Sequence, residues 1–364
     1  MLEFLTLKSE TFGLDISDLS LKIAKLKKRR NSLSLVSFGE MEIKPGIIER
    51  GEIKKEDELV KIIKEALLKL RGEKIKTRYI VASLPEEKAF LQIIQMPLMK
   101  EEELKKAVYF EAENYIPLPL NEVYLDFQVI KPVVNHLDHF DVLIVAMPKK
   151  IVDSYISCFK KANLIPLVLE IESQAAARAL IKNEVSPSPI LLIDFGLPRA
   201  SFIIFSGYTL RFTSSIPVSS KEFTQAIADN LKITFSEAEE MKIKYGIEGK
   251  GGEKITEILN PYLKELIKEI EDYLSYYHTH IHHEHLPLDS KEVEKILLCG
   301  GGANLKGLTN FLSLKLKIPV ELGNPWINIL PQPLREIPEL PFEKSLSFTN
   351  VLGLALRDIK HTNI

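Results

Sequence analysis

The stretch LLIDFGLPRASFIIF, residues 191–205, places an Asp-Phe-Gly tripeptide between two apolar runs. Apolar runs on both sides of a turn with Gly196 and Pro198 predict a β-hairpin, with Asp194 at the end of its first strand. In a protein kinase the same tripeptide holds Mg²⁺, but that fold also needs a His-Arg-Asp catalytic loop and an N-terminal glycine-rich loop. The sequence contains neither. We therefore exclude a protein kinase and interpret Asp194 as part of a strand turn.

A second copy of this layout lies near the N-terminus, in FGLDISDLSLKIAKL, residues 12–26. Both copies have an apolar strand, an aspartate (Asp15 or Asp194), a small residue two positions later, a turn and a second apolar strand. Such a duplication suggests two related domains that face each other across a cleft. Turn amides can bind phosphate oxygens, and carboxylates suit Mg²⁺. The pair therefore predicts a site for a magnesium-bound nucleotide.

A glycine loop forms the third element of this site, in LLCGGGANLKGL, residues 297–308. We expect a buried strand, a loop and then a helix from Asn304. Glycines allow the backbone to approach a base or ribose closely, and a helix N-terminus favours anions. Alone, the loop fits a tight turn without a ligand equally well. Together with the two aspartate turns it favours a nucleotide.

The composition sets the class of protein. A chain of 364 residues can form two or more domains, and strands alternate with helical patterns, which predicts an α/β architecture. A net charge of −2 gives no surface for a polyanion, so we expect no nucleic-acid partner. Two distant cysteines, no signal-peptide pattern and no run of 18 apolar residues predict a reduced cytoplasmic protein without direct membrane insertion.

The order of GLDIS, LIDFG, CGGGANLKGL and a closing GLALR helix resembles the actin-like ATPase superfamily, with its two phosphate hairpins and adenosine loop. Within it, the chain is similar to the PilM family of type IV pilus assembly proteins, which are relatives of FtsA. The segment 82–130, which contains EAENYIPLPLNEVYLDFQVI, carries most of this resemblance. TLRFTSSIPV, AEEMKIKYG and GNPWINI add to it, so that it covers most of the chain.

The resemblance implies a duplicated two-domain fold, actin-like (ribonuclease H-like), with an FtsA-type inserted subdomain. The implied parts are a first domain 1A (1–77 with 167–186 and 345–364), an inserted subdomain 1C (78–166) and a second domain 2A/2B (187–344). A groove between 1A and 1C is implied to capture the cytoplasmic N-terminal tail of a PilN-like inner-membrane protein. The protein would then lie peripheral to the inner membrane, in contact with other inner-membrane pilus assembly proteins. Burial of every apolar face of 79–95 and 101–116 within 1C stays the alternative.

The resemblance also implies roles for single residues in binding ATP and Mg²⁺. Asp15 and Asp194 match the aspartates on the magnesium side, and Gly196 matches the glycine of the second hairpin. The adenosine loop corresponds to Gly300, Gly301, Gly302 and Asn304. Glu239 and Lys242 match a helix-borne pair that touches ribose and base, although a solvated i,i+3 ion pair is equally consistent.

The sequence departs from the family pattern at both hairpins. Ser17 stands where relatives carry glycine and still offers its amide and hydroxyl, while Asp18 adds negative charge near the phosphates if it points inward. Lys22 either offsets that charge or is solvated. Pro198 has no N–H, so one phosphate donor is lost. We expect weakened nucleotide binding.

Two functions fit these features. One is a Mg-ATP-binding scaffold of type IV pilus assembly, at most a slow ATPase; the other is a nucleotide-free, peptide-binding adaptor of the same machine. A sugar or acetate kinase lacks a substrate signature, and self-association stays open. For orienting water in hydrolysis we name Glu170, whose alternative is a charge at a helix start.

A histidine cluster, YYHTHIHHEHLP, follows a long helical pattern. His278 and His282 are four residues apart, a spacing that zinc sites use on one helix face. The stretch lies at a helix end before Pro287, so we favour a solvated helix end.

Overall fold

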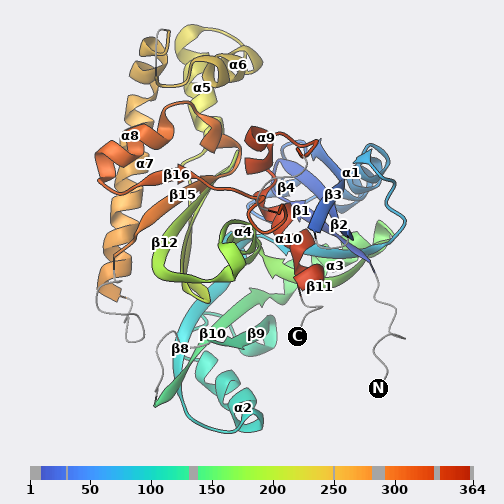
Figure 1. The fold of residues 1–364 in the computed structure, drawn as a ribbon. Helices are drawn as coiled ribbons and strands as arrows, with labels where there is room; N and C mark the ends of the chain where they lie inside the picture. Colours follow the sequence, from blue (N-terminus) through green and yellow to red (C-terminus); the bar gives the residue numbers. More distant parts are fainter. Residues whose placement is uncertain are drawn as a thin grey trace.

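The computed structural model describes residues 10–29, 32–130, 138–248, 251–280, 292–331 and 337–360. Within these ranges the chain forms two large sheets and a smaller three-stranded sheet, each with its own helices (Figure 1). A short hairpin, β4 (Ile48–Glu49) with β5 (Glu52–Ile53), follows the first strands.

The first sheet has the strand order β11-β7-β1-β2-β3-β6. Its strands are β1 (Thr11–Ile16), β2 (Ser20–Arg29), β3 (Ser32–Glu42), β6 (Arg71–Gly72), β7 (Tyr79–Leu84) and β11 (Ile165–Ile171). Phe12 and Leu14 of β1 pack in one core with α1 (Glu56–Leu68) and α3 (Lys149–Lys161). Gly13 points to the other face, against α10 (Thr349–Lys360), because strand side chains alternate. Both faces of this sheet are therefore covered by helices.

The second sheet has the order β14-β13-β12-β15-β16. Its strands are β12 (Ser186–Phe195), β13 (Ala200–Gly207), β14 (Thr209–Ile216), β15 (Lys295–Cys299) and β16 (Val320–Leu322). Leu191 and Ile193 pack with α5 (Ser220–Leu231), α7 (Glu253–His280) and α8 (Leu308–Leu316), while α6 (Phe235–Tyr245) follows α5. Leu192 faces the opposite way and shares a core with α4 (Glu172–Leu180), which lies between the two large sheets.

The two large sheets repeat one arrangement. In the first, β1 pairs antiparallel with β2 and parallel with β7; in the second, β12 pairs antiparallel with β13 and parallel with β15. Asp15 and Asp194 occupy the same place, one residue before the end of β1 and of β12. The duplication expected from the sequence is therefore present in the backbone.

The third sheet, β8-β10-β9, lies at the lower end of the molecule in Figure 1, with α2 beside it. Its elements are β8 (Phe90–Pro97), α2 (Glu101–Ala112), β9 (Val123–Val129) and β10 (His139–Pro148). The remaining short elements are η2 (Glu86–Lys88), η3 (Leu120–Glu122), η4 (Lys182–Glu184), η6 (Gly301–Asn304) and α9 (Phe342–Leu346). The exact division into domains 1A, 1C and 2A/2B stays a prediction.

No helix within the described ranges has the length and apolar character that crossing a membrane requires.

Candidate functional site

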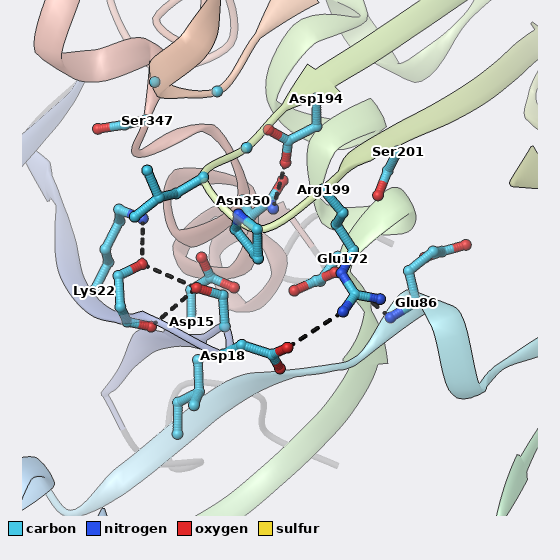
Figure 2. A pocket seen from close by; sticks show the side chains of 18 of the residues that line it. Asp15, Asp18, Lys22, Glu86, Glu172, Asp194, Arg199, Ser201, Ser347 and Asn350 are labelled. Atoms are coloured by element: carbon cyan, nitrogen blue, oxygen red, sulfur yellow. Dashed lines mark hydrogen bonds and ion pairs between the residues drawn. The ribbon is translucent and has the colours of Figure 1, made fainter. Parts of the chain in front are cut away.

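A cleft of about 360 Å³ opens between the two large sheets, where β1 and β12 end. Pockets for small molecules usually measure about 300–1,000 Å³. The β1–β2 turn, η2, the start of α4, the β12–β13 turn, η6 and the α9–α10 region all contribute to its walls. Figure 2 shows how side chains from both sheets point into it. We call this space the cleft.

Asp15 lies in the cleft, almost completely buried. The hydroxyl of Ser83, on the neighbouring strand β7, donates to Asp15 Oδ1 at 2.8 Å and accepts the Ile16 amide at 3.1 Å. Burial raises the pKa of the Asp15 carboxyl, and the Lys22 ammonium and the Ser83 hydrogen bond oppose that rise in part. Lys22 stands opposite Asp15 in the β1–β2 register. Its Nζ donates to Ser20 Oγ at 2.9 Å.

Asp194 mirrors Asp15 on the other side of the cleft. The Nδ2 of Asn350, in the first turns of α10, donates to Asp194 Oδ2 at 2.9 Å. Burial raises the pKa of the Asp194 carboxyl; the Asn350 hydrogen bond lowers it, and the Asp15 charge raises it. Asn350 Oδ1 is buried and has no hydrogen-bond partner among the described residues. The cleft therefore holds an amide oxygen that a ligand could satisfy.

Two glutamates complete this acidic group. Glu172, the first residue of α4, lines the cleft, and burial raises its pKa well above the ordinary value. The charges of Asp15, Asp194 and Glu86 raise it further. Glu86 is also buried, and its Oε2 accepts the Ser173 amide at 3.0 Å. Four carboxyl groups with raised pKa values thus face one small space, which favours a bound cation.

These groups fit Mg²⁺ better than they fit free phosphate. Eight acidic and three basic side chains line the cleft, and oxygen atoms are the ligands that Mg²⁺ prefers. Among the described residues, no three acidic, histidine or cysteine side chains are placed to bind one metal ion together. Mg²⁺ usually takes one or two carboxylates and completes its shell with water and substrate phosphates. The donor set therefore suits a cation that arrives with a phosphorylated ligand.

The two turns use the amides that we expected to be free for phosphate. The Ser17 amide donates to Ser20 O at 2.9 Å, and its hydroxyl lies 3.0 Å from Ser20 Oγ. The Gly196 amide donates to Arg199 O at 3.0 Å. A Cβ on Gly196 would lie 2.9 Å from that same oxygen, which explains the glycine without a left-handed backbone. Both residues line the cleft, but their amides close the turns themselves.

The glycine loop packs directly against the Asp194 turn. Gly300 has φ +82°, and a Cβ there would lie 2.4 Å from Asp194 Oδ1. Gly300, Gly301 and Asn304 line the cleft, whereas Gly302 is buried against Phe195. The expected helix from Asn304 is not present: η6 ends at Asn304, and α8 begins only at Leu308. Asn304 Nδ2 instead donates to Glu343 O at 2.8 Å and fixes the loop to α9.

Glu239 and Lys242 do not line the cleft. Lys242 is 4% exposed and donates to Ser220 Oγ at 2.8 Å, to Thr224 Oγ1 at 2.7 Å and to Glu239 Oε2 at 2.8 Å. The i,i+3 ion pair is therefore present, with Lys242 buried and the Glu239 side chain 36% exposed. The lysine joins α6 to α5, and contact of this pair with ribose and base stays a prediction. Ile243, one residue further along α6, lines the cleft in its place.

Glu170 lies outside the cleft as well. Its carboxylate accepts hydrogen bonds from Arg178 at 2.5 and 2.9 Å and from Arg357 at 2.5 Å, so both oxygens are hydrogen-bonded to arginines. It lines a second cavity of about 840 Å³, between β9 of the third sheet and β11 of the first. We call this cavity the groove. Tyr124 and Phe127 of β9 form part of its apolar wall.

The sequence reasoning missed Glu172, Glu86, Ser83, Asn350 and Arg199. Glu172 carries a signal, since it stands two residues after Glu170 at the same strand-to-helix junction. Glu86 and Ser83 lie at the end of a strand that runs parallel to β1, where polar residues reach the same edge. Asn350 carries no local signal.

The histidine cluster is described only in part. His278 lies in the last turn of α7, whereas His282, His283 and His285 lie outside the described residues. The zinc hypothesis therefore has no structural test here.

Comparison with known proteins gives the fold a family. A family model described as type IV pilus assembly protein PilM matches residues 13–359. The solved PilM-PilN type IV pilus biogenesis complex has a chain that aligns over 97% of this chain and 99% of its own, with TM-score 0.79 and 28% identity. MreB5 of Spiroplasma citri bound to AMPPNP aligns over 98% of both chains, with TM-score 0.57 and 13% identity, which shows the shared actin-like fold alone.

A sequence relative supports the FtsA connection. FtsA of Helicobacter pylori is 34% identical over 85 residues, 23% of this chain. The match spans 17% of FtsA, so it speaks for a shared segment and not for a shared task. Since the family model covers nearly the whole sequence and the fold agrees with it, the chain belongs to the family of type IV pilus assembly proteins PilM, on the actin-like fold.

Proposed function

We propose that this chain is a cytoplasmic scaffold of type IV pilus assembly that binds the N-terminal tail of a PilN-like inner-membrane protein in the groove and Mg-ATP in the cleft. The observation that carries the proposal is the likeness, over almost the whole chain, to a protein solved in a PilM-PilN complex. The tail would hold the scaffold at the inner membrane, where it can contact other pilus assembly proteins.

The edge strand β9 gives the groove a way to bind an extended peptide. Ile130 donates its amide to Asp141 O on β10 at 2.8 Å. Antiparallel bonding alternates along a strand, so the amides of Phe127 and Val129 point away from β10. Consistent with this, the Phe127 amide donates to the side chain of Asp126. A peptide can add to this edge as a further strand, with apolar side chains of the groove beside it.

The polar floor of the groove can bind the backbone of an extended peptide. Arg178 and Arg357 both donate to the Glu170 carboxylate. Arg178 Nε also lies 3.7 Å from Glu184 Oε2, so two arginines face two carboxylates at the base. Arg357 Nε is buried and has no hydrogen-bond partner among the described residues, which leaves a donor for a ligand. Carbonyl oxygens of an extended peptide fit such a floor. We therefore assign Glu170 to the groove and not to catalysis.

The cleft supports the nucleotide half of the proposal. We propose that Asp15 and Asp194 hold Mg²⁺, directly or through water, and a bound Mg²⁺ would offset the charge of the phosphates. A solved relative of the same fold, MreB5, is bound to AMPPNP. Gly300 and Gly301 bring backbone close to the ligand space, with Ile243 as an apolar neighbour.

Glu172 is the residue that we propose to orient water if ATP is hydrolysed. It lies in the cleft with Asp15 and Asp194, and burial with the neighbouring negative charges raises its pKa, which makes its carboxylate a stronger proton acceptor for the attacking water. Positioning and electrostatics supply most of the catalysis in phosphoryl transfer, so the placement of this carboxylate would set the rate of turnover.

A pull-down tests the groove. The full chain is incubated with an immobilised synthetic N-terminal tail of a PilN-like protein, beside a scrambled tail. We expect capture by the native sequence, and less capture by Val129→Lys, which places a charge on the groove wall. Leu68→Lys, on the exposed end of α1, is the matched control and should bind as wild type does. Equal capture of both tails contradicts this half of the proposal.

Calorimetric titration with ATP tests the cleft. We expect binding that requires Mg²⁺ and that Asp194→Ala weakens at least about tenfold, because the variant removes a group on the magnesium side. Absence of heat in the wild type contradicts the nucleotide half and leaves the peptide half standing.

A second candidate is the nucleotide-free adaptor. The observation that favours it is the use of the Ser17 and Gly196 amides inside their own turns, which leaves these two donors unavailable to phosphate. The same titration separates the two candidates.

A further inference from the structure

Arg199, in the turn after β12, joins the two walls of the cleft. Its guanidinium lies 3.2 Å from Asp18 Oδ2 in the β1–β2 turn and contacts the Glu87 carboxylate on η2 (Figure 2 shows the Asp18 pair). Arg199 belongs to the second sheet, whereas Asp18 and Glu87 belong to segments attached to the first. One side chain of one wall thus holds two carboxylates of the other.

Backbone hydrogen bonds hold the Asp18 carboxylate in place independently of Arg199. Its two oxygens accept the amides of Arg50 and Gly51, each at 2.9 Å. The negative charge that we expected near the phosphates is therefore turned toward the β4–β5 hairpin and toward Arg199. A pre-positioned carboxylate loses little further side-chain entropy when it pairs, which removes a cost that weakens most ion pairs.

The burial of this contact also separates it from ordinary surface pairs. The side chains of Asp18, Arg199 and Glu87 are 16%, 22% and 17% exposed. Burial lowers the pKa of Arg199, and the Asp18 charge opposes this. The charged form of the buried guanidinium is therefore stabilised by its carboxylate partners. A second pair across the cleft, Lys344 with Glu40, is 51% exposed on the lysine side and is screened by water. The Arg199 contact is the stronger candidate for a structural bridge.

We infer that the Asp18–Arg199–Glu87 bridge holds the cleft closed in the protein without a nucleotide. The bridge thereby joins the two walls, as phosphates and a cation do when they bind between two such turns. The inference rests on the proposed function for the identity of the cleft as a nucleotide site. The bridge consists of side chains of the protein itself, so the cleft can be closed whether or not a nucleotide is bound.

Hydrogen-exchange mass spectrometry of the full chain without nucleotide tests the bridge. We compare wild type with Arg199→Gln, which removes the charge but keeps a polar side chain, and with Lys161→Gln. Lys161 pairs with Glu56 inside one half of the molecule and is the matched control. We expect Arg199→Gln to exchange about tenfold faster in peptides covering both turns, 16–20 and 196–199, and Lys161→Gln to match wild type there.

A double-variant comparison identifies the partner. Glu87→Gln should speed exchange in the same peptides, and adding it to Arg199→Gln should change little more, because both remove one contact. Unchanged exchange in Arg199→Gln, or equal acceleration in Lys161→Gln, overturns the inference.

Two further measurements keep the test decisive. If Arg199→Gln does not fold, Glu87→Gln alone decides, because it removes one carboxylate of the same contact: faster exchange in both turns supports the bridge, and unchanged exchange overturns it. Added Mg-ATP reports separately on the proposed function: no protection of the cleft by Mg-ATP contradicts nucleotide binding, while the variant results still decide the bridge.

Discussion

Glu170 and Glu172 are separated by one residue, yet they face two different sites. On a continuous strand they would point to the same face, but β11 ends at Ile171 and Glu172 begins α4. The change from strand to helix turns the second side chain into the cleft and leaves the first with Arg178 and Arg357. A sequence pattern locates such a boundary only to within a few residues, so it could not choose between the two glutamates.

Glu172→Gln should shift the pH dependence of stability. The pKa of Glu172 is raised in the folded protein, so the folded state holds the proton more tightly than the unfolded state, and stability falls as pH rises from about 4.5 through the folded pKa. The variant lacks this loss and should gain stability relative to wild type between pH 5 and pH 7.5, by about 1.4 kcal/mol for each pKa unit. Urea unfolding at both pH values measures this difference.

Glu170→Gln is the matched control for that experiment. It removes the carboxylate that two arginines of the groove share and should lower stability at both pH values, by about 3 kcal/mol. An equal effect of Glu172→Gln at pH 5 and pH 7.5 contradicts the prediction.

Two adjacent glycines should differ sharply on substitution. Gly300→Ala would place its Cβ against Asp194 Oδ1 at 2.4 Å, at φ +82°, so we expect a loss on the order of 3 kcal/mol and weaker Mg-ATP binding. Gly301→Ala meets Ser347 Cβ at 3.9 Å, an ordinary contact, and should stay near wild type. Thermal unfolding of both variants decides this, and equal stability of the two contradicts it.

At the scale of elements, α10 reaches both sites, as α4 also does. Asn350 bonds Asp194 in the cleft, and Arg357, seven residues later, bonds Glu170 in the groove. The helix sits close to its neighbours: Cβ atoms on Gly13 of β1 and Gly353 of α10 would lie 2.5 Å from Val351 O and 1.9 Å from Ala175 O. Backbone contact at this distance leaves α10 little room to shift on its own.

Gly353→Ala tests that packing. Helix propensity alone favours alanine over glycine by about 1 kcal/mol, but a Cβ at 1.9 Å from a backbone oxygen forces α10 and α4 apart. We expect the clash to win, with a net loss of about 2–3 kcal/mol in urea unfolding. A variant as stable as wild type or more stable shows that the helices can separate at no cost.

Phe127→Pro tests strand addition at β9. Proline removes the outward N–H, and edge strands tolerate it, so the pairing with β10 should survive. Phe127→Ala, which keeps the N–H, is the control for the lost ring. We expect the proline variant to bind a PilN-like tail about fivefold to tenfold more weakly than the alanine variant, the worth of one main-chain hydrogen bond. Equal affinity of the two in fluorescence anisotropy rules out the added strand.

At the scale of the whole molecule, the sequence predicts the architecture well. It predicts poorly which backbone amides and side chains are available to bind a ligand. The duplicated strand-turn-strand unit gives the actin-like fold because it depends on patterns of many residues, and the comparisons confirm that fold. The use of the Ser17 amide inside its turn and the start of α8 at Leu308 depend on local geometry that no pattern contains. The role of Asn350 depends on a contact across 156 residues.

The two sites should influence each other by equal factors. If Mg-ATP changes the affinity for a PilN-like tail, linkage requires the tail to change the affinity for Mg-ATP by the same factor. Because α10 and the β11–α4 junction each carry one residue of either site, we expect a factor of about five or more. Calorimetry in both orders checks it, and equal tail affinity with and without bound Mg-ATP contradicts it.

Within the described ranges, one edge of β9 pairs with no other strand, which has a consequence for the protein before it meets its partner. An open strand edge accepts any extended chain, including another copy of the same protein, and natural proteins limit this risk with polar groups at the edge. Here the Asp126 carboxylate occupies the Phe127 amide, and the Tyr109 hydroxyl lies 3.4 Å from Leu125 O. A peptide ligand must displace these two contacts when it pairs with β9. The same contacts that protect the edge from self-association therefore lower the affinity for the tail.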